Sequence, residues 1–193
     1  IAFFAPAVKD WKRIIYFEGN ARGSIDNLSA NKLKLKSDNT IIDGDIALKG
    51  LPDIYSTFID FKSNDLQTNY NDVVKLVPTL RNIGQPQLSR LGDIRFRGSF
   101  TGFIKDFVAY GNINTSLGNL NADLNMKLRD NQVPTYSGNI SSAGFNLGSF
   151  FNNKQLGKVA LSVQVKGRGF NLKDLNADFN GKVSQLEFSG YTY

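Results

Sequence analysis

Apolar and polar residues alternate along most of this chain. From Leu120 to Leu128 every second residue is apolar, and a similar alternation returns at Val159–Lys166 and Leu175–Asn180. Successive side chains of a β-strand point to opposite faces, so this period of two gives each strand one apolar and one polar face. The pattern predicts an all-β protein whose long apolar surface meets either a core or a hydrophobic ligand.

Turn-forming residues separate the alternating segments. More than half of the residues are predicted to lie in strands, at 14–17, 21–25, 31–37, 40–49, 57–63, 92–100, 107–115, 118–129, 135–141, 158–167, 176–183 and 185–189. The alternation fails at three places, where short helices are predicted: 5–12, 71–77 and 147–152. Asn71 or Asp72 can cap the second helix, which should end before Pro78. Residues 79–90 are predicted to form a loop because they contain Gly84 and Pro86.

No linker divides the chain, so residues 1–193 are expected to form a single β-rich module. The chain begins at Ile1 rather than Met, which predicts a piece of a longer protein. A weak internal repeat places Gly50, Gly102 and Gly169 after a strand, each followed by a large apolar residue, a short spacer and Asp. Glycine permits positive φ and Asp bonds nearby amides, so these units predict tight turns.

Composition limits the chemistry that the chain can perform. It contains neither cysteine nor histidine, which removes thiolate metal sites and the commonest general base. No nucleotide-binding loop or calcium loop is complete. The net charge of +6 is spread along the polar phase of the strands, which indicates solvated faces more than a nucleic-acid or anionic-lipid site. We expect no enzyme activity, no cofactor, no metal and no nucleic-acid partner.

Several motifs resemble TamB proteins of the Bacteroidetes type, which belong to the wider AsmA-like group of envelope proteins. The resemblance covers essentially the whole chain and rests on Phe3-Phe4-Ala-Pro, Gly50-Leu-Pro-Asp, the segment from Gly102 to Gly111, Phe145-Asn-Leu-Gly148 and the segment from Phe188 to Tyr193. It implies a long periplasmic protein that an N-terminal helix outside this chain anchors in the inner membrane. It also implies an elongated β-taco, an open trough with a hydrophobic inner face and a few short helices.

The resemblance implies transport of phospholipids between the inner and outer membranes, and outer-membrane biogenesis with a barrel partner of the Omp85 type. The chain would then be one segment of a hydrophobic groove for phospholipid acyl chains. The candidate groove residues share one phase of their strands: Ile94, Phe96, Leu120, Leu124, Met126, Leu128, Val159, Leu161, Val163 and Val165. Asn121, Asn125, Lys127 and Ser162 are predicted to face the other way.

Two alternatives remain open at this point. The first is a structural or chaperone module that assists the assembly of outer-membrane proteins or autotransporters with a partner of the Omp85 type, by adding strands to an exposed edge. The second is a secreted β-solenoid that binds or cleaves polysaccharide. Bound lipid would favour the groove, binding of barrel-strand peptides would favour the chaperone, and a cleft lined by Tyr and Asp would favour polysaccharide.

Overall fold

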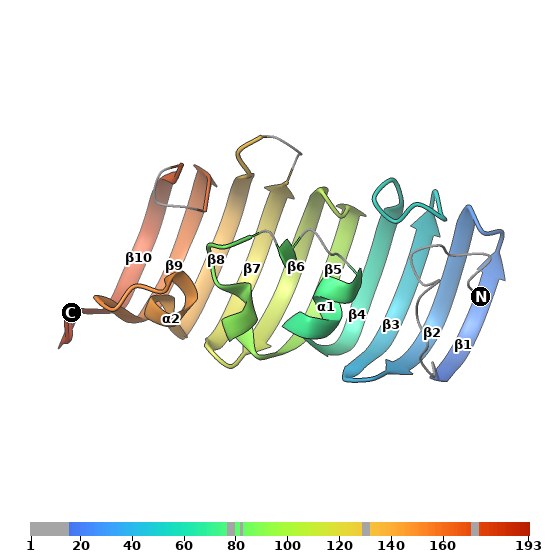
Figure 1. Cartoon of the computed structure of the whole chain (residues 1–193), viewed down its shortest axis with the longest axis horizontal. Coiled ribbons are helices and arrows are strands. Elements are labelled where there is room, and N and C mark those ends of the chain that lie inside the picture. Colours follow the sequence, from blue (N-terminus) through green and yellow to red (C-terminus); the bar gives the residue numbers. More distant parts are fainter. Residues whose placement is uncertain (1–15, 77–79, 82, 129–131, 171–173) are drawn as a thin grey trace.

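The computed structural model describes residues 16–76, 80–81, 83–128, 132–170 and 174–193. Eleven strands form one antiparallel sheet in which the spatial order of the strands follows their order in the sequence (Figure 1). The elements are β1 (Tyr16–Gly23), β2 (Asn27–Ser37), β3 (Thr40–Lys49), β4 (Phe58–Asn69), α1 (Tyr70–Leu76), η3 (Leu88–Leu91), β5 (Asp93–Phe103), β6 (Asp106–Thr115), β7 (Gly118–Lys127), β8 (Thr135–Asn146), α2 (Leu147–Phe151), β9 (Leu156–Arg168), β10 (Asn176–Phe188) and β11 (Tyr191–Thr192).

The all-β prediction is confirmed. Strands make up 67% of the described residues, and the sheet does not close on itself. The helices α1 and α2 confirm two of the three predicted helical segments, whereas the segment predicted near 5–12 lies outside the described residues. The loop predicted at 79–90 includes 3-10 geometry that the sequence did not indicate, at residues 80–81 and in η3.

Two predicted strand breaks are wrong. The turn predicted at Glu18-Gly19-Asn20 is a β-bulge inside β1, and the break predicted between 183 and 185 is a bulge inside β10. A bulge adds one residue to a strand and shifts the alternation by one position, while the backbone continues in the sheet. A strand prediction based on alternation alone therefore ended each strand at its bulge.

The predicted tight turn is confirmed at Gly102, where only Ile104 and Lys105 lie between β5 and β6; the connections that begin at Gly50 and Gly169 are longer, and the second includes residues 171–173, which lie outside the described residues. Gly50 and Gly169 directly follow β3 and β9, whereas Gly102 is the second-to-last residue of β5; their φ angles are +106°, +74° and +130°. A β-carbon at Gly102 would lie 2.5 Å from the carbonyl oxygen of Asp106. Glycine is thus required there both by the backbone conformation and by the close approach of the next strand.

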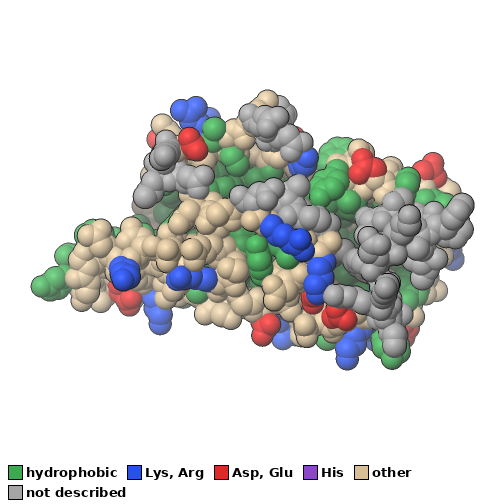
Figure 2. Space-filling model, viewed as in Figure 1, with side chains coloured by type: hydrophobic (Ala, Val, Ile, Leu, Met, Phe, Trp, Pro, Cys, Tyr) green, Lys and Arg blue, Asp and Glu red, His purple; other side chains and the backbone are tan. Residues whose placement is uncertain are grey.

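The two faces of the sheet differ in character. Both helices lie against one face, here called the inner face; the opposite one is the outer face (Figure 1). Inner-face side chains include the buried residues Ala30 and Leu33 of β2, Phe61 of β4 and Val159 of β9. Figure 2 shows hydrophobic side chains over the middle of the sheet on this face. The outer face of β2–β4 is charged, with Lys34 opposite Asp43 and Asp45 opposite Lys62.

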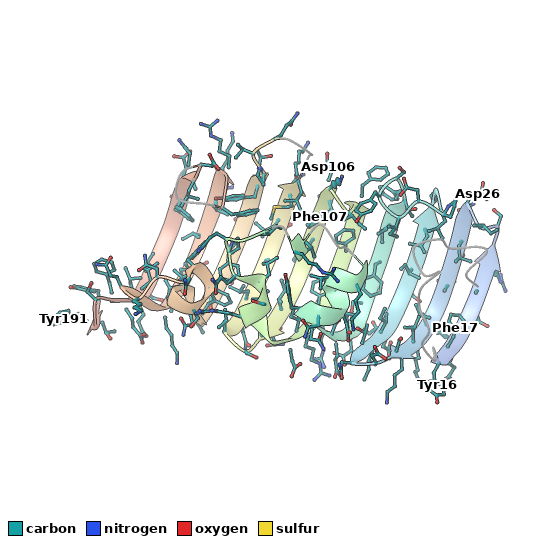
Figure 3. All side chains as sticks on the ribbon, in the orientation of Figure 1. Tyr16, Phe17, Asp26, Asp106, Phe107 and Tyr191 are labelled. Atoms are coloured by element: carbon teal, nitrogen blue, oxygen red, sulfur yellow. The ribbon has the colours of Figure 1, made fainter. Side chains whose placement is uncertain are left out.

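The two ends of the sheet carry exposed aromatic side chains. Tyr16 and Phe17 lie at the β1 end and Tyr191 lies at the β11 end (Figure 3). Their side chains are 67%, 52% and 69% exposed. The apolar character of the molecule therefore continues to both edges of the sheet.

Candidate functional site

An apolar groove lies on the inner face over β7–β10, with a volume of about 350 Å³. Seven of the ten candidate groove residues line it: Leu120, Leu124 and Met126 of β7, and Val159, Leu161, Val163 and Val165 of β9. These strands are not neighbours, because β8 runs between them. The alternation of each strand directs its apolar phase into the same space.

A glycine leaves one position in the floor of the groove without a side chain. Gly138 of β8 pairs with Leu124 on one side and with Val165 on the other. It contributes no side chain between these two apolar residues, and its φ of +145° is unfavourable for other residues. The position next to it on the same face of β8 carries Ile140, which lines the groove. The space over Gly138 thus results from the absence of a side chain at this position of β8.

Helix α2 forms a roof over this floor. Leu147, Phe150 and Phe151 of α2 line the groove together with Pro86 and Phe170 from loops. The Phe150 ring meets Phe145 of β8 edge-to-face, with ring centroids 5.4 Å apart. This pairing joins the roof to the sheet, since edge-to-face contacts add stability beyond simple burial.

Hydrogen bonds hold α2 in place at both ends. The side-chain oxygen of Asn146 accepts a bond of 2.8 Å from the Ser149 amide, which caps the first turn. The amide of Gln87 donates to the Phe150 carbonyl at 2.8 Å, and Arg90 Nη2 donates to Asn152 Oδ1 at 3.0 Å. The roof is therefore attached to the loop before β5 as well as to β8.

The groove opens toward β10. Phe179 of β10 lines it, yet its side chain is 65% exposed, and Val183 on the same strand is 55% exposed. Val163 and Val165 on the neighbouring strand are only 7% and 1% exposed. The apolar lining thus passes from a packed floor at β9 to a solvent-accessible mouth at β10.

The groove lining contains few polar groups, and these are either hydrogen-bonded within the protein or buried. The Ser142 hydroxyl donates to the Asn119 carbonyl at 2.8 Å. The Tyr136 ring stacks on Phe170, with centroids 5.5 Å apart and 6° between the planes. Burial raises the pKa of the Tyr136 hydroxyl, because ionisation there would leave a poorly solvated charge. The groove consequently offers apolar burial and no charged group to a ligand.

Three candidate residues lie elsewhere. Ile94 and Phe96 share the inner phase of β5, where Phe96 pairs with Leu66 and Ile113, but they do not line the groove. Leu128 lies one residue beyond β7 and bonds through its amide to the Lys105 carbonyl. Met126 and Lys127 are on opposite faces: Met126 lines the groove, and Lys127 lines a separate hollow together with Asn125.

Phe145, Phe150 and Phe151 are not among the groove residues that the sequence predicts. They pack, and they also line the groove. Phe179 lies in an alternating segment, which was the signal for it. No pattern in the sequence indicated Pro86 or Phe170, because they reach the groove from loops distant in the chain.

No family model, curated protein or solved structure matches this chain. The resemblance to TamB proteins therefore stays a prediction. Within the described ranges, no helix is long and apolar enough to span a bilayer. The same described residues contain no cluster of three or more acidic, His or Cys side chains able to bind a metal ion.

Proposed function

We propose that this module holds phospholipid acyl chains in its inner-face groove and forms one segment of a hydrophobic path between the inner and outer membranes. The observation that carries the proposal is the roofed apolar groove of about 350 Å³ that opens at β10. Its volume is at the lower end of the range of about 300–1,000 Å³ for ligand sites. The periplasmic location, the anchor elsewhere in the protein and the outer-membrane partner are part of the same proposal, and the TamB resemblance supports them.

The expected affinity for an acyl chain suits transient binding during transport better than long-term retention of lipid. Each buried methylene contributes about 0.8 kcal/mol, so about five of them contribute about 4 kcal/mol. That free energy corresponds to a dissociation constant of about 1 mM. A chain held so weakly leaves readily, and the mouth at Phe179 and Val183 gives it a way to do so without unfolding the roof.

Crosslinking with a photoactivatable phosphatidylethanolamine tests the proposal. The Phe179→Ser variant removes an exposed apolar side chain at the mouth, and Gln185→Ser is its control on the same strand and outside the groove. We expect Phe179→Ser to lose most of the crosslink and Gln185→Ser to keep it. Equal crosslinking of both variants, or no crosslinking of the original protein, would contradict the proposal.

One observation favours the chaperone role as a second candidate. Strand β11 pairs only with the end of β10, at Glu187 and Phe188. In the described part of the chain, no strand lies beside β10 from Asn176 to Gln185 on the side away from β9. Such an edge can accept an additional strand through main-chain hydrogen bonds. A barrel-strand peptide should bind there, and the same peptide with alternate N-methylated amides should not.

A further inference from the structure

The outer face of the sheet carries a second, chemically different hollow. It measures about 850 Å³, spans β5–β10 and lies on the side turned away from the viewer in Figure 1. One cross-strand row of side chains along it consists of Arg97, Asn112, Asn121, Ser141 and Ser162. Each residue pairs directly with the next, so hydroxyl and amide groups follow one another across the strands.

A second row runs parallel to the first, two residues along each strand. It consists of Tyr110, Asp123, Asn139, Gln164 and Asn180. Each of these five side chains is exposed. Among the described residues, no side-chain hydrogen bond involves Asn139, Gln164 or Asn180, so their amides are open to a ligand as both donors and acceptors.

The choice of residues goes beyond what solubility requires. Asn is depleted in β-strands, and the outer face of β2–β4 in this same sheet uses Lys and Asp. On β6 and β7 the amides are linked: Asn114 Nδ2 donates to Asn112 Oδ1 at 2.8 Å, and Asn112 Nδ2 donates to Asn121 Oδ1 at 2.9 Å. These bonds fix the direction in which the remaining amide groups are presented.

The charge of the hollow does not favour a polyanionic ligand. Arg97 and Asp123 are the only charged residues that line it, and Arg97 already forms an ion pair with Asp65 at 3.5 Å. Nucleic acids require several cations to neutralise phosphates. A neutral ligand with many hydroxyl and amide groups fits this surface better.

Tyr110 adds an exposed aromatic ring to the hollow. Its side chain is 62% exposed beside Asp123, its direct cross-strand neighbour. A tyrosine ring offers an apolar surface and a polar end, which suits the C–H face and the hydroxyls of a sugar. The hollow therefore contains one Tyr beside one Asp among amide and hydroxyl side chains, and Tyr and Asp are the residue types that would favour polysaccharide.

We propose that the outer face binds an extended β-1,4-linked polysaccharide whose sugars carry hydroxyl and acetamido groups. Adjacent strands lie about 4.8 Å apart, close to the length of one sugar unit in such a chain, so each strand can meet one sugar. The six strands β5–β10 then span about 24 Å. This inference concerns the outer face and stands independently of lipid binding on the inner face.

Calorimetric titration of the whole chain with the β-1,4-linked hexamer of N-acetylglucosamine tests the inference. We expect saturable binding, and Tyr110→Ala should weaken it about tenfold through loss of the ring contact. Tyr191→Ala is the matched control, because that tyrosine is 69% exposed and lies outside the hollow. Maltohexaose, whose α-linkages coil the chain, should bind far more weakly than the β-linked hexamer.

A second measurement uses the unaltered protein and so does not depend on how the variants fold. In a two-dimensional NMR titration, the side-chain amide signals of Asn121 and Asn139 should shift with the same saturation curve as the heat. Absence of binding at millimolar hexamer, equal binding of maltohexaose, unchanged affinity of Tyr110→Ala, or static amide signals would each overturn the inference.

Discussion

Separate alanine substitutions of Phe145 and Phe179 measure whether the apolar groove is packed at one end and open at the other. Both side chains line the groove, on β8 and β10. Phe145 is 2% exposed and meets Phe150 of the roof edge-to-face, whereas Phe179 is 65% exposed. The two residues thus have the same side chain, but one is buried and the other is largely exposed.

The expected losses follow from these exposures. Phe145→Ala should lower the free energy of unfolding by about 3–5 kcal/mol, because it removes a fully buried ring and leaves a cavity. About a third of Phe179 is buried, so Phe179→Ala should cost only about 1 kcal/mol. A typical domain has about 5–15 kcal/mol in total, so the first change is severe and the second is tolerated.

Urea unfolding followed by far-UV circular dichroism measures both losses from the midpoint and the slope. Phe145→Leu is the control for size, and it should cost less than the alanine variant because it fills most of the space. If Phe179→Ala cost as much as Phe145→Ala, the mouth at β10 would be closed. If Phe145→Ala cost less than about 1 kcal/mol, α2 would not pack as a roof.

Three further substitutions or conditions test other parts of the structure. Val163→Asp places a carboxylate at a position that is 7% exposed and should lower the unfolding free energy by more than about 3 kcal/mol, seen as an early urea midpoint; a wild-type midpoint would contradict the burial. The hydrogen bond from Arg95 lowers the pKa of Asp65 to about 2, so its stabilisation is present above about pH 4 and lost as the pH falls toward 2; Asp65→Asn should flatten this part of the stability–pH curve. Gly102→Ala should lower the melting temperature and cost more than about 1 kcal/mol, because φ is +130° and the hairpin lies too close, while unchanged melting would refute the turn argument.

The sequence predicted the strands well except where the alternation shifts. Five register shifts lie between Glu18 and Asn20, Ala30 and Leu33, Ser63 and Leu66, Ser142 and Phe145, and Val183 and Gln185, and two more lie between Asp43 and Gly44 and between Leu186 and Phe188. The predicted segments ended or began at or beside the first five, at 17 and 21, 31, 63, 141, and 183 and 185, whereas the predicted segments 40–49 and 185–189 run through the other two. Hairpin pairing continues the strand through a bulge, and a period-two reading of one chain cannot detect that continuation.

The groove was predictable in part for a related reason. Its walls on β7 and β9 lie on uninterrupted alternating segments, so their apolar phase could be read directly. The roof depends on which loop and which helical turn fold back over the sheet. That choice is made by tertiary contacts such as the one between Phe150 and Phe145, and neither propensity nor periodicity encodes it.

Deleting single residues from β10 tests whether the bulges preserve the division between the two faces. Ser184 is the extra residue of its bulge, because Val183 pairs with Leu161 and Gln185 pairs with Ala160. Its removal leaves these pairings intact, so the ΔSer184 protein should unfold within about 1 kcal/mol of the original. Deleting Asn180 instead, in a regular stretch, moves Phe179 to the outer face and should cost several-fold more in urea unfolding. Equal tolerance of both deletions would mean that β10 slips freely, and the assignment of one apolar and one polar face at this edge would be wrong.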